Sequence, residues 1–365
     1  MNTGNPDLIR LIRTEIEKHG PVSFAWFMQQ ALYHPEHGYY SSGRCAIGRR
    51  GDYFTNVSVG PLFGQLLAAQ FAEVWERLGK IDNFEIVEQG THDGQFAHDA
   101  LEWAQKCVPE FFEALRYRIV EPFPILQERQ QRMLEAFREK VEWRDSLQPF
   151  VGVHFSNELL DAIPVRLISD GKEKFVGLDG DKFVFVERPV HGEWTFNQGA
   201  LDWIDSVAAN LQRGYVIAID YGRSSDESQS NVQVRAQHRN LDSPFDQIGY
   251  ADTTTHVLWQ SIVERAQANG LRIAGFTDQH HFLTGIISTW PELLQGCSED
   301  LTALSSHVPS AGGDLGIKRQ LQTLLHPEML GRAFQVLGLE KDSGAPRLAG
   351  FKFGRDPKSE LGLTQ

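Results

Sequence analysis

Glu88, Gly90 and Gly94 have the types and spacing of a cofactor-binding turn. Glu88 ends an apolar run that starts at Phe84, and the two glycines follow it at once. Glycine suits a tight turn that lets a ligand lie close to the backbone, and the helix after such a turn offers unpaired N–H groups. The pattern predicts a nucleotide-type cofactor, although an α/β turn without a ligand gives similar sequences.

The spacing of the glycines indicates which cofactor this is. Dinucleotide-binding turns follow G-x-G-x-x-G. The glycines of this segment do not match that spacing, so a nicotinamide oxidoreductase is disfavoured. Here His92 stands where a middle glycine would be, and an acid, Glu88, precedes the turn. This suits a cofactor that has a cationic amino-acid end and no phosphate, as S-adenosyl-L-methionine (SAM) has. We expect Glu88, Gly90 and Gly94 to hold its methionine end.

A second apolar strand ends in Glu121. In doubly wound folds an acid placed about 20 residues after the glycine turn binds the ribose hydroxyls. Glu121 lies at a comparable distance, so we expect it to bind the ribose of the same cofactor.

The segment Asn157-Glu158-Leu-Leu-Asp161 follows a later strand. Glu158 and Asp161 would share one face if a helical turn began there, and their carboxylates would accept hydrogen bonds from a guanidinium fork. Asn157 would hold an amine or the cofactor. These three are the candidate catalytic residues, although acids at a helix start are also favoured simply by the helix dipole.

The elements that must position these residues alternate between strand and helix from residue 84 onward, which predicts an α/β fold with a Rossmann-like doubly wound sheet. We divide the chain into an N-terminal helical segment (1–80), a cofactor-binding core with a β-ribbon insertion near 165–190 (81–224), and a C-terminal part that completes the sheet (225–365). Strands are expected at 84–89, 117–121, 150–156, 214–220, 271–276, 333–339 and 347–353.

Composition excludes several classes of protein. The chain has 365 residues and a formal net charge of −13, which argues against nucleic-acid binding because that needs clustered cations. No G-x-S-x-G elbow of an α/β-hydrolase is present. His34 and His37, and the pair His280-His281, do not have the spacing of metal ligands.

Targeting signals are also missing from the sequence. No apolar run approaches the roughly 20 residues that span a bilayer, and the first residues lack a secretory or mitochondrial pattern. We therefore predict a cytoplasmic protein. Cys45, Cys107 and Cys297 form no CxxC pair and are expected to be free thiols. The oligomeric state is left open.

The chain resembles the MidA-like SAM-dependent methyltransferases over about residues 20–340. This family includes a mitochondrial complex I assembly factor that methylates an arginine of a complex I subunit. The segments that carry the resemblance are 31–40 (ALYHPEHGYY), 51–55 (GDYFT), Phe63-Gly64, 157–164 (NELLDAIP), 219–222 (IDYG), 252–257 (DTTTHV) and 279–283 (QHHFL).

The resemblance implies a class I methyltransferase that acts on a protein arginine, with a complex I subunit as one possible target. It implies that loop 39–55 covers the cofactor, with Asp52 and Thr55 among the binding residues. The chain departs from the family pattern at His92, which replaces the middle glycine, and at Leu258, where an acid is usual. The alternative function is therefore a catalytically weak assembly or binding protein that kept the fold.

Overall fold

The structure is a computed structural model of the chain. It describes residues 3–43, 55–190, 195–223, 232–236, 239–294, 313–344 and 347–363. Asp52, Cys45 and Cys297 lie outside these residues.

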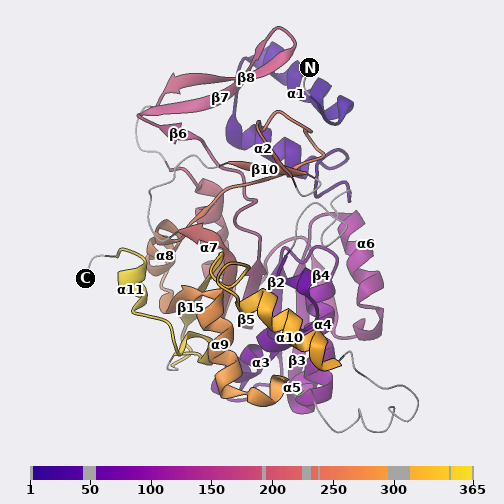
Figure 1. The fold of residues 1–365 in the computed structure, drawn as a ribbon, viewed down its shortest axis with the longest axis vertical. Helices are drawn as coiled ribbons and strands as arrows, with labels where there is room; N and C mark the ends of the chain where they lie inside the picture. Colours follow the sequence, from indigo (N-terminus) through magenta and orange to yellow (C-terminus); the bar gives the residue numbers. More distant parts are fainter. Residues whose placement is uncertain are drawn as a thin grey trace.

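The centre of the molecule is a mostly parallel sheet in the order β4-β3-β2-β5-β9-β15-β14 (Figure 1). The first five of these strands run parallel to one another, whereas β15 is antiparallel to both of its neighbours. A short strand, β13, also pairs with β9. The strands are β2 (Phe84–Gln89), β3 (Leu115–Val120), β4 (Val141–Arg144), β5 (Phe150–Asn157), β9 (Leu211–Arg223), β13 (Val257–Leu258), β14 (Arg272–Asp278) and β15 (Phe334–Lys341).

Helices cover both faces of this sheet. Successive residues of a strand point to opposite faces, and Ile86 and Val87 of β2 accordingly belong to two different apolar cores. The first core is shared with α3, α4, α5, α9 and α10, and the second with α7 and α8. These helices are α3 (Leu62–Arg77), α4 (Gln95–Cys107), α5 (Pro109–Ala114), α7 (Gln198–Asn210), α8 (Trp259–Ala268), α9 (Gln279–Thr289) and α10 (Gly313–Leu325). The fold is the predicted doubly wound α/β arrangement.

Two glycines allow the central strands to approach closely. Gly152 of β5 and Gly214 of β9 are register partners with φ of 145° and 138°. A Cβ atom on Gly214 would overlap the carbonyl group of Gly152, and one on Gly152 would overlap that of Glu85. Only glycine fits here without moving a strand.

A second body of structure lies beyond the carboxyl ends of the strands, at the top of Figure 1. Its apolar core joins α1, α2 and an antiparallel ribbon. The ribbon confirms the antiparallel strands expected near 165–190. A small sheet, in the order β11-β10-β12, lies beside it. The elements are α1 (Pro6–His19), β1 (Val22–Ser23), α2 (Phe24–Tyr33), β6 (Ile168–Ser169), β7 (Lys172–Asp179), β8 (Lys182–Pro189), β10 (Gln233–Ala236), β11 (Arg239–Leu241) and β12 (Asp252–Thr254).

The strand expected at 347–353 is wrong. The segment forms a 3₁₀ helix, η4 (Ala349–Phe351). Its backbone N–H groups donate to side chains of α3 instead of to a strand: Ala349 N lies 3.1 Å from Glu73 Oε2, and Gly350 N lies 2.8 Å from Gln70 Oε1. The remaining helical elements are η1 (Val57–Val59), α6 (Pro124–Met133), η2 (Glu135–Phe137), η3 (Pro291–Leu294) and α11 (Pro357–Glu360).

Cys107, at the end of α4, is disulfide-bonded, so the expectation of three free thiols is wrong. The absence of a CxxC motif does not exclude a bond between distant segments. Within the described ranges, no helix has both the length and the apolar character needed to cross a membrane. The division into three segments stays a prediction.

Candidate active site

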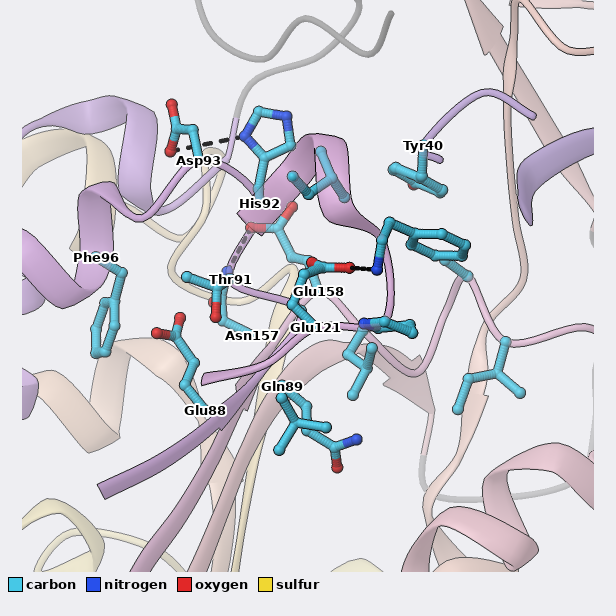
Figure 2. Close-up of a pocket in the computed structure, with 18 of the residues that line it drawn as sticks. Tyr40, Glu88, Gln89, Thr91, His92, Asp93, Phe96, Glu121, Asn157 and Glu158 are labelled. Carbon is cyan, nitrogen blue, oxygen red and sulfur yellow. Dashed lines mark hydrogen bonds and ion pairs between the residues drawn. The ribbon is translucent and has the colours of Figure 1, made fainter. Parts of the chain in front are cut away.

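A cavity of about 990 Å³ opens at the carboxyl ends of β2, β3 and β5, where ligands bind in open α/β sheets. Its size is near the upper end of the roughly 300–1,000 Å³ typical of small-molecule sites. Figure 2 shows side chains from all three strand ends around it. The predicted residues that line it are Thr55, Glu88, Gly90, Glu121, Asn157 and Glu158.

Glu88 is buried at the floor of this cavity. Its Oε2 atom accepts a hydrogen bond of 2.6 Å from the Tyr117 hydroxyl of the neighbouring strand. Burial raises the pKa of Glu88 to about 7, although the Tyr117 hydrogen bond acts in the opposite direction. A cation near this carboxyl would favour its ionised form.

The turn after β2 has the backbone that its glycines predict. Gly90 has a φ of 81° and Gly94 a φ of 91°, both in the left-handed region that glycine adopts readily. A Cβ atom on Gly90 would lie 3.3 Å from the Leu159 side chain. Gly94 immediately precedes α4 and is not among the residues that line the cavity.

His92 has a φ of 54°, in the left-handed region that glycine adopts readily and other residues rarely adopt. Figure 2 shows its imidazole turned toward Asp93 and away from Glu88. Its Nδ1 atom lies 3.7 Å from Asp93 Oδ1. Burial raises the pKa of Asp93, but hydrogen bonding and charge from His92, together with backbone hydrogen bonds, hold that pKa below its usual range. His92 is among the residues that line the cavity.

Glu121 is buried and accepts two hydrogen bonds, from Phe123 N at 3.0 Å and from Gln130 Nε2 at 3.1 Å. Burial raises its pKa. The same Gln130 amide also donates to the carbonyl oxygen of His92 at 2.9 Å. Gln130 therefore ties the acid at the end of β3 to the glycine turn after β2.

Glu158 follows β5 with a φ of 54°, a strained conformation of the kind that clusters at functional sites. Its Oε1 atom accepts hydrogen bonds from Asn157 Nδ2 at 2.9 Å and from Asn56 N at 3.3 Å. The Asn56 side chain in turn donates to Asn157 Oδ1 at 3.0 Å. Burial raises the pKa of Glu158 to about 8, so this carboxyl is largely protonated at neutral pH unless a cation binds beside it.

No helix begins at Glu158, so the expected helical turn is wrong. A buried carboxylate, Asp220 of β9, shapes the segment instead. It accepts hydrogen bonds from the backbone N–H groups of Leu160 at 2.7 Å, Asp161 at 3.2 Å and Tyr221 at 2.7 Å. The alternative role of Glu158 and Asp161 as helix-start acids is excluded for the same reason.

A second, smaller cavity of about 230 Å³ adjoins the first, and Tyr40 and Glu158 line both. We call it the acid chamber. Asp161 faces this chamber and is absent from the lining of the larger cavity. The acid chamber is lined by Tyr40, Glu158, Asp161, Tyr221, Gln233, Arg235, Asp252, Thr254, Thr255, His256 and Ala333.

Sequence reasoning assigned no role to Asp252, Tyr40 or Arg235. Tyr40 donates a hydrogen bond of 2.6 Å to Asp252 Oδ1, and both lie in segments that carry the family resemblance. That position is the sequence feature that could have marked Tyr40 and Asp252 as candidate site residues. Asp52, which was predicted to bind the cofactor, lies outside the described residues. In the described part of the chain, no group of three or more His, Cys, Asp or Glu side chains is arranged to hold a metal ion.

A family model described as "Putative S-adenosyl-L-methionine-dependent methyltransferase" matches residues 66–277. This is more than half of the chain, which therefore belongs to this family. A Burkholderia thailandensis protein described as a "likely methyl transferase", crystallised with S-adenosyl-homocysteine, superimposes with a TM-score of 0.83 at 27% identity, covering 98% of this chain and 99% of that one.

Curated relatives are named for a narrower activity. The Drosophila melanogaster "Protein arginine methyltransferase NDUFAF7 homolog, mitochondrial" is 24% identical over 390 residues, which cover 92% of this chain and 85% of the relative. The Danio rerio protein arginine methyltransferase NDUFAF7 is 23% identical over 387 residues, with 92% and 87% coverage. These relatives are named mitochondrial, and the cytoplasmic location of this chain stays a prediction.

The protein is a SAM-dependent methyltransferase with a class I fold. The cavity suits this cofactor, because it combines a glycine turn, where a side chain would crowd Leu159, with buried acids at two adjacent strand ends. SAM carries a positive sulfonium and ammonium group at one end and a ribose diol in its middle, and carboxylates are complementary to both.

Proposed function

We propose that the protein transfers methyl groups to the guanidinium of a protein arginine. The observation that carries this proposal is that Glu158 lines both the cofactor cavity and the acid chamber. A substrate side chain in the chamber would therefore lie next to the cofactor. The names of the curated relatives support the same acceptor.

In this proposal Glu88 and the turn containing Gly90 and Gly94 hold the methionine end of SAM, and Glu121 binds the ribose hydroxyls. Thr55 lines the same cavity and would contribute to binding. Asp52, outside the described residues, is proposed for the same role on the basis of the family resemblance. When bound, SAM supplies a methyl group activated by a positive sulfur.

Glu158 and Asp161 orient the acceptor. A guanidinium has a pKa above about 12, so it arrives protonated and must lose a proton when its nitrogen gains a methyl group. The Glu158 carboxylate is placed to accept a hydrogen bond from one guanidinium nitrogen and to take that proton. Asn157 donates to Glu158 Oε1 and thereby holds the carboxyl at the boundary between the two cavities.

The substrate is proposed to be a protein, with a respiratory complex I subunit as the candidate that the resemblance implies. Proteome-wide mass spectrometry of a host with and without this gene tests the proposal. We expect at least one mono- or dimethylated arginine to disappear on deletion, to return with the wild-type gene and not to return with Glu158→Gln. An unchanged profile of methylated arginines would refute the arginine assignment while leaving SAM binding intact.

A further inference from the structure

The acid chamber collects three carboxyl groups from two separate parts of the fold. Glu158 and Asp161 come from the segment after β5, whereas Asp252 comes from β12 of the small sheet. Asp161 and Asp252 are both buried. The chamber therefore forms only where the small sheet meets the strand ends of the central sheet.

The carboxyl groups are close enough to repel one another. Burial raises the pKa of Asp161 well above its usual range, and the charges of Asp220, Asp252 and Glu158 raise it further. Like charges that share a site resist ionisation together. A positively charged guest would relieve this repulsion.

Arg235 balances this acidity only in part. It is the cross-strand register partner of Asp252, and its charge lowers the pKa of Asp161. Its Nη2 atom donates to Gln233 Oε1 at 2.7 Å and its Nε atom to Asn240 Oδ1 at 3.2 Å. The Arg235 guanidinium thus donates to side chains of its own small sheet, and the described lining residues of the chamber include three carboxyls and one arginine.

The size of the chamber limits its guest. Its volume of about 230 Å³ lies below the roughly 300–1,000 Å³ of pockets that take whole small molecules. A single long side chain, entering beside Tyr40 and Glu158, matches it better than a second cofactor would.

We propose that the acid chamber binds the side-chain cation of the methyl acceptor, and that Asp252, held by Tyr40, is the specificity-determining carboxylate that selects a guanidinium over an ammonium. This inference rests on the proposed arginine function. The physical reason is the spread of the acceptors. A guanidinium presents five N–H donors in a planar fork, whereas an ammonium is a compact charge with three donors. Carboxylates that come from two parts of the fold can accept more hydrogen bonds from a guanidinium fork than from an ammonium group.

Tyr40 makes Asp252 a rigid acceptor. The phenol donates to Oδ1 at 2.6 Å and stacks on Tyr33, with ring centroids 5.6 Å apart. The Tyr33 hydroxyl in turn donates to Ala162 O at 3.1 Å, one residue after Asp161. The carboxylates of the two parts of the fold are thereby linked through a pair of stacked tyrosines.

The test uses the full chain saturated with S-adenosyl-homocysteine and titrates it with ethylguanidinium, a truncated arginine side chain, and with n-propylammonium as the lysine counterpart. Calorimetry should show ethylguanidinium binding and n-propylammonium binding at least about fivefold more weakly. Asp252→Asn should weaken ethylguanidinium about tenfold or more, because a charged hydrogen bond is lost, with the affinity for S-adenosyl-homocysteine unchanged.

Asp205→Asn is the matched control. It is the same acid-to-amide change, made at a surface residue that pairs with Arg265, and it should leave both affinities unchanged. Tyr40→Phe, which retains the stacked ring, should weaken ethylguanidinium about threefold by loosening Asp252. It also serves as the second variant if Asp252→Asn does not fold, as judged by its thermal melting.

Equal ethylguanidinium affinity in the wild type and Asp252→Asn would overturn the inference, and so would n-propylammonium binding as tightly as ethylguanidinium. No binding of ethylguanidinium to a protein that still binds S-adenosyl-homocysteine would also overturn it. Failure of the proposed function has a different signature, namely an unchanged profile of methylated arginines in the host.

Discussion

The hydroxyl of Tyr117 lies 2.6 Å from Glu88 Oε2, so that a phenol on one strand holds the buried carboxyl of the next. The geometry places a titratable acid in the lining of the larger cavity and fixes its direction. Its pKa of about 7 lies near neutral pH, which makes the ionisation of Glu88 measurable by titration.

Cofactor affinity is expected to fall as the pH is lowered through about 7. Glu88 is protonated below this pH in the free protein, whereas a cationic cofactor end favours the carboxylate, so binding must release a proton. Each further unit of acidification then costs up to about tenfold in affinity. Calorimetric titration of SAM between about pH 6 and pH 8 measures this.

Tyr117→Phe should move the same transition to higher pH, because the lost hydrogen bond is one that lowers the pKa of Glu88. A flat affinity profile in the wild-type protein would show that Glu88 does not face the charged end of the cofactor.

His92→Gly is expected to leave the affinity for SAM within about threefold of the wild-type value. The imidazole is paired with Asp93, and glycine adopts the same φ of 54° without strain. Calorimetry of both proteins checks this. A wild type that binds no SAM, together with a variant that does, would instead support the weakly catalytic alternative in which His92 blocks the site.

Asp220→Asn should lower turnover strongly while leaving SAM affinity close to that of the wild type. Asp220 now accepts hydrogen bonds from three backbone N–H groups. The amide of Asn would place its own N–H donors against at least one of them, so the segment carrying Glu158 and Asp161 loses its shape. We expect a loss of about 1–3 kcal/mol in the free energy of unfolding, measured by denaturant titration.

The surface change Asp205→Asn is the control for Asp220→Asn and should alter neither quantity. Wild-type turnover by Asp220→Asn would mean that the segment after β5 is positioned by other contacts.

Gly214→Ala should destabilise the protein by about 3 kcal/mol or more, because its Cβ atom would overlap the Gly152 carbonyl in the middle of the sheet. Gly171→Ala is the matched control. Gly171 has a φ of 71° but open space around it, so only the backbone strain of about 1 kcal/mol is added. Similar stabilities for the two variants would show that the strands separate readily.

Much of the fold follows from the sequence, because strand and helix alternate with clear apolar periodicity from residue 84 onward. The strand expected at 347–353 failed for a tertiary reason. Its apolar residues are compatible with a strand, but the side chains of Gln70 and Glu73 of α3 accept hydrogen bonds from the backbone N–H groups of Ala349 and Gly350. No local pattern carries that information.

The site was predictable to a similar extent. Glu88, Glu121 and Glu158 could be placed because they end parallel strands, whose carboxyl ends share one edge of the sheet. The helical turn expected at Glu158 gave way to a loop shaped by Asp220, which is distant in sequence. Asp252 could not be placed, because it reaches the site from a small separate sheet whose docking the sequence does not encode locally.

Glu158 and Tyr40 line both cavities and form the wall between them. Because the two cavities share this wall, the charge of an occupant on one side affects the binding of an occupant on the other. A cation on one side draws on the same negative charge that would hold a cation on the other. A bound donor and the proposed acceptor would therefore compete for one carboxylate. In the proposed reaction Glu158 takes the proton that the acceptor loses, so this carboxyl becomes neutral and its charge no longer holds the methylated product. We therefore expect proton transfer to the shared wall to favour release of the product.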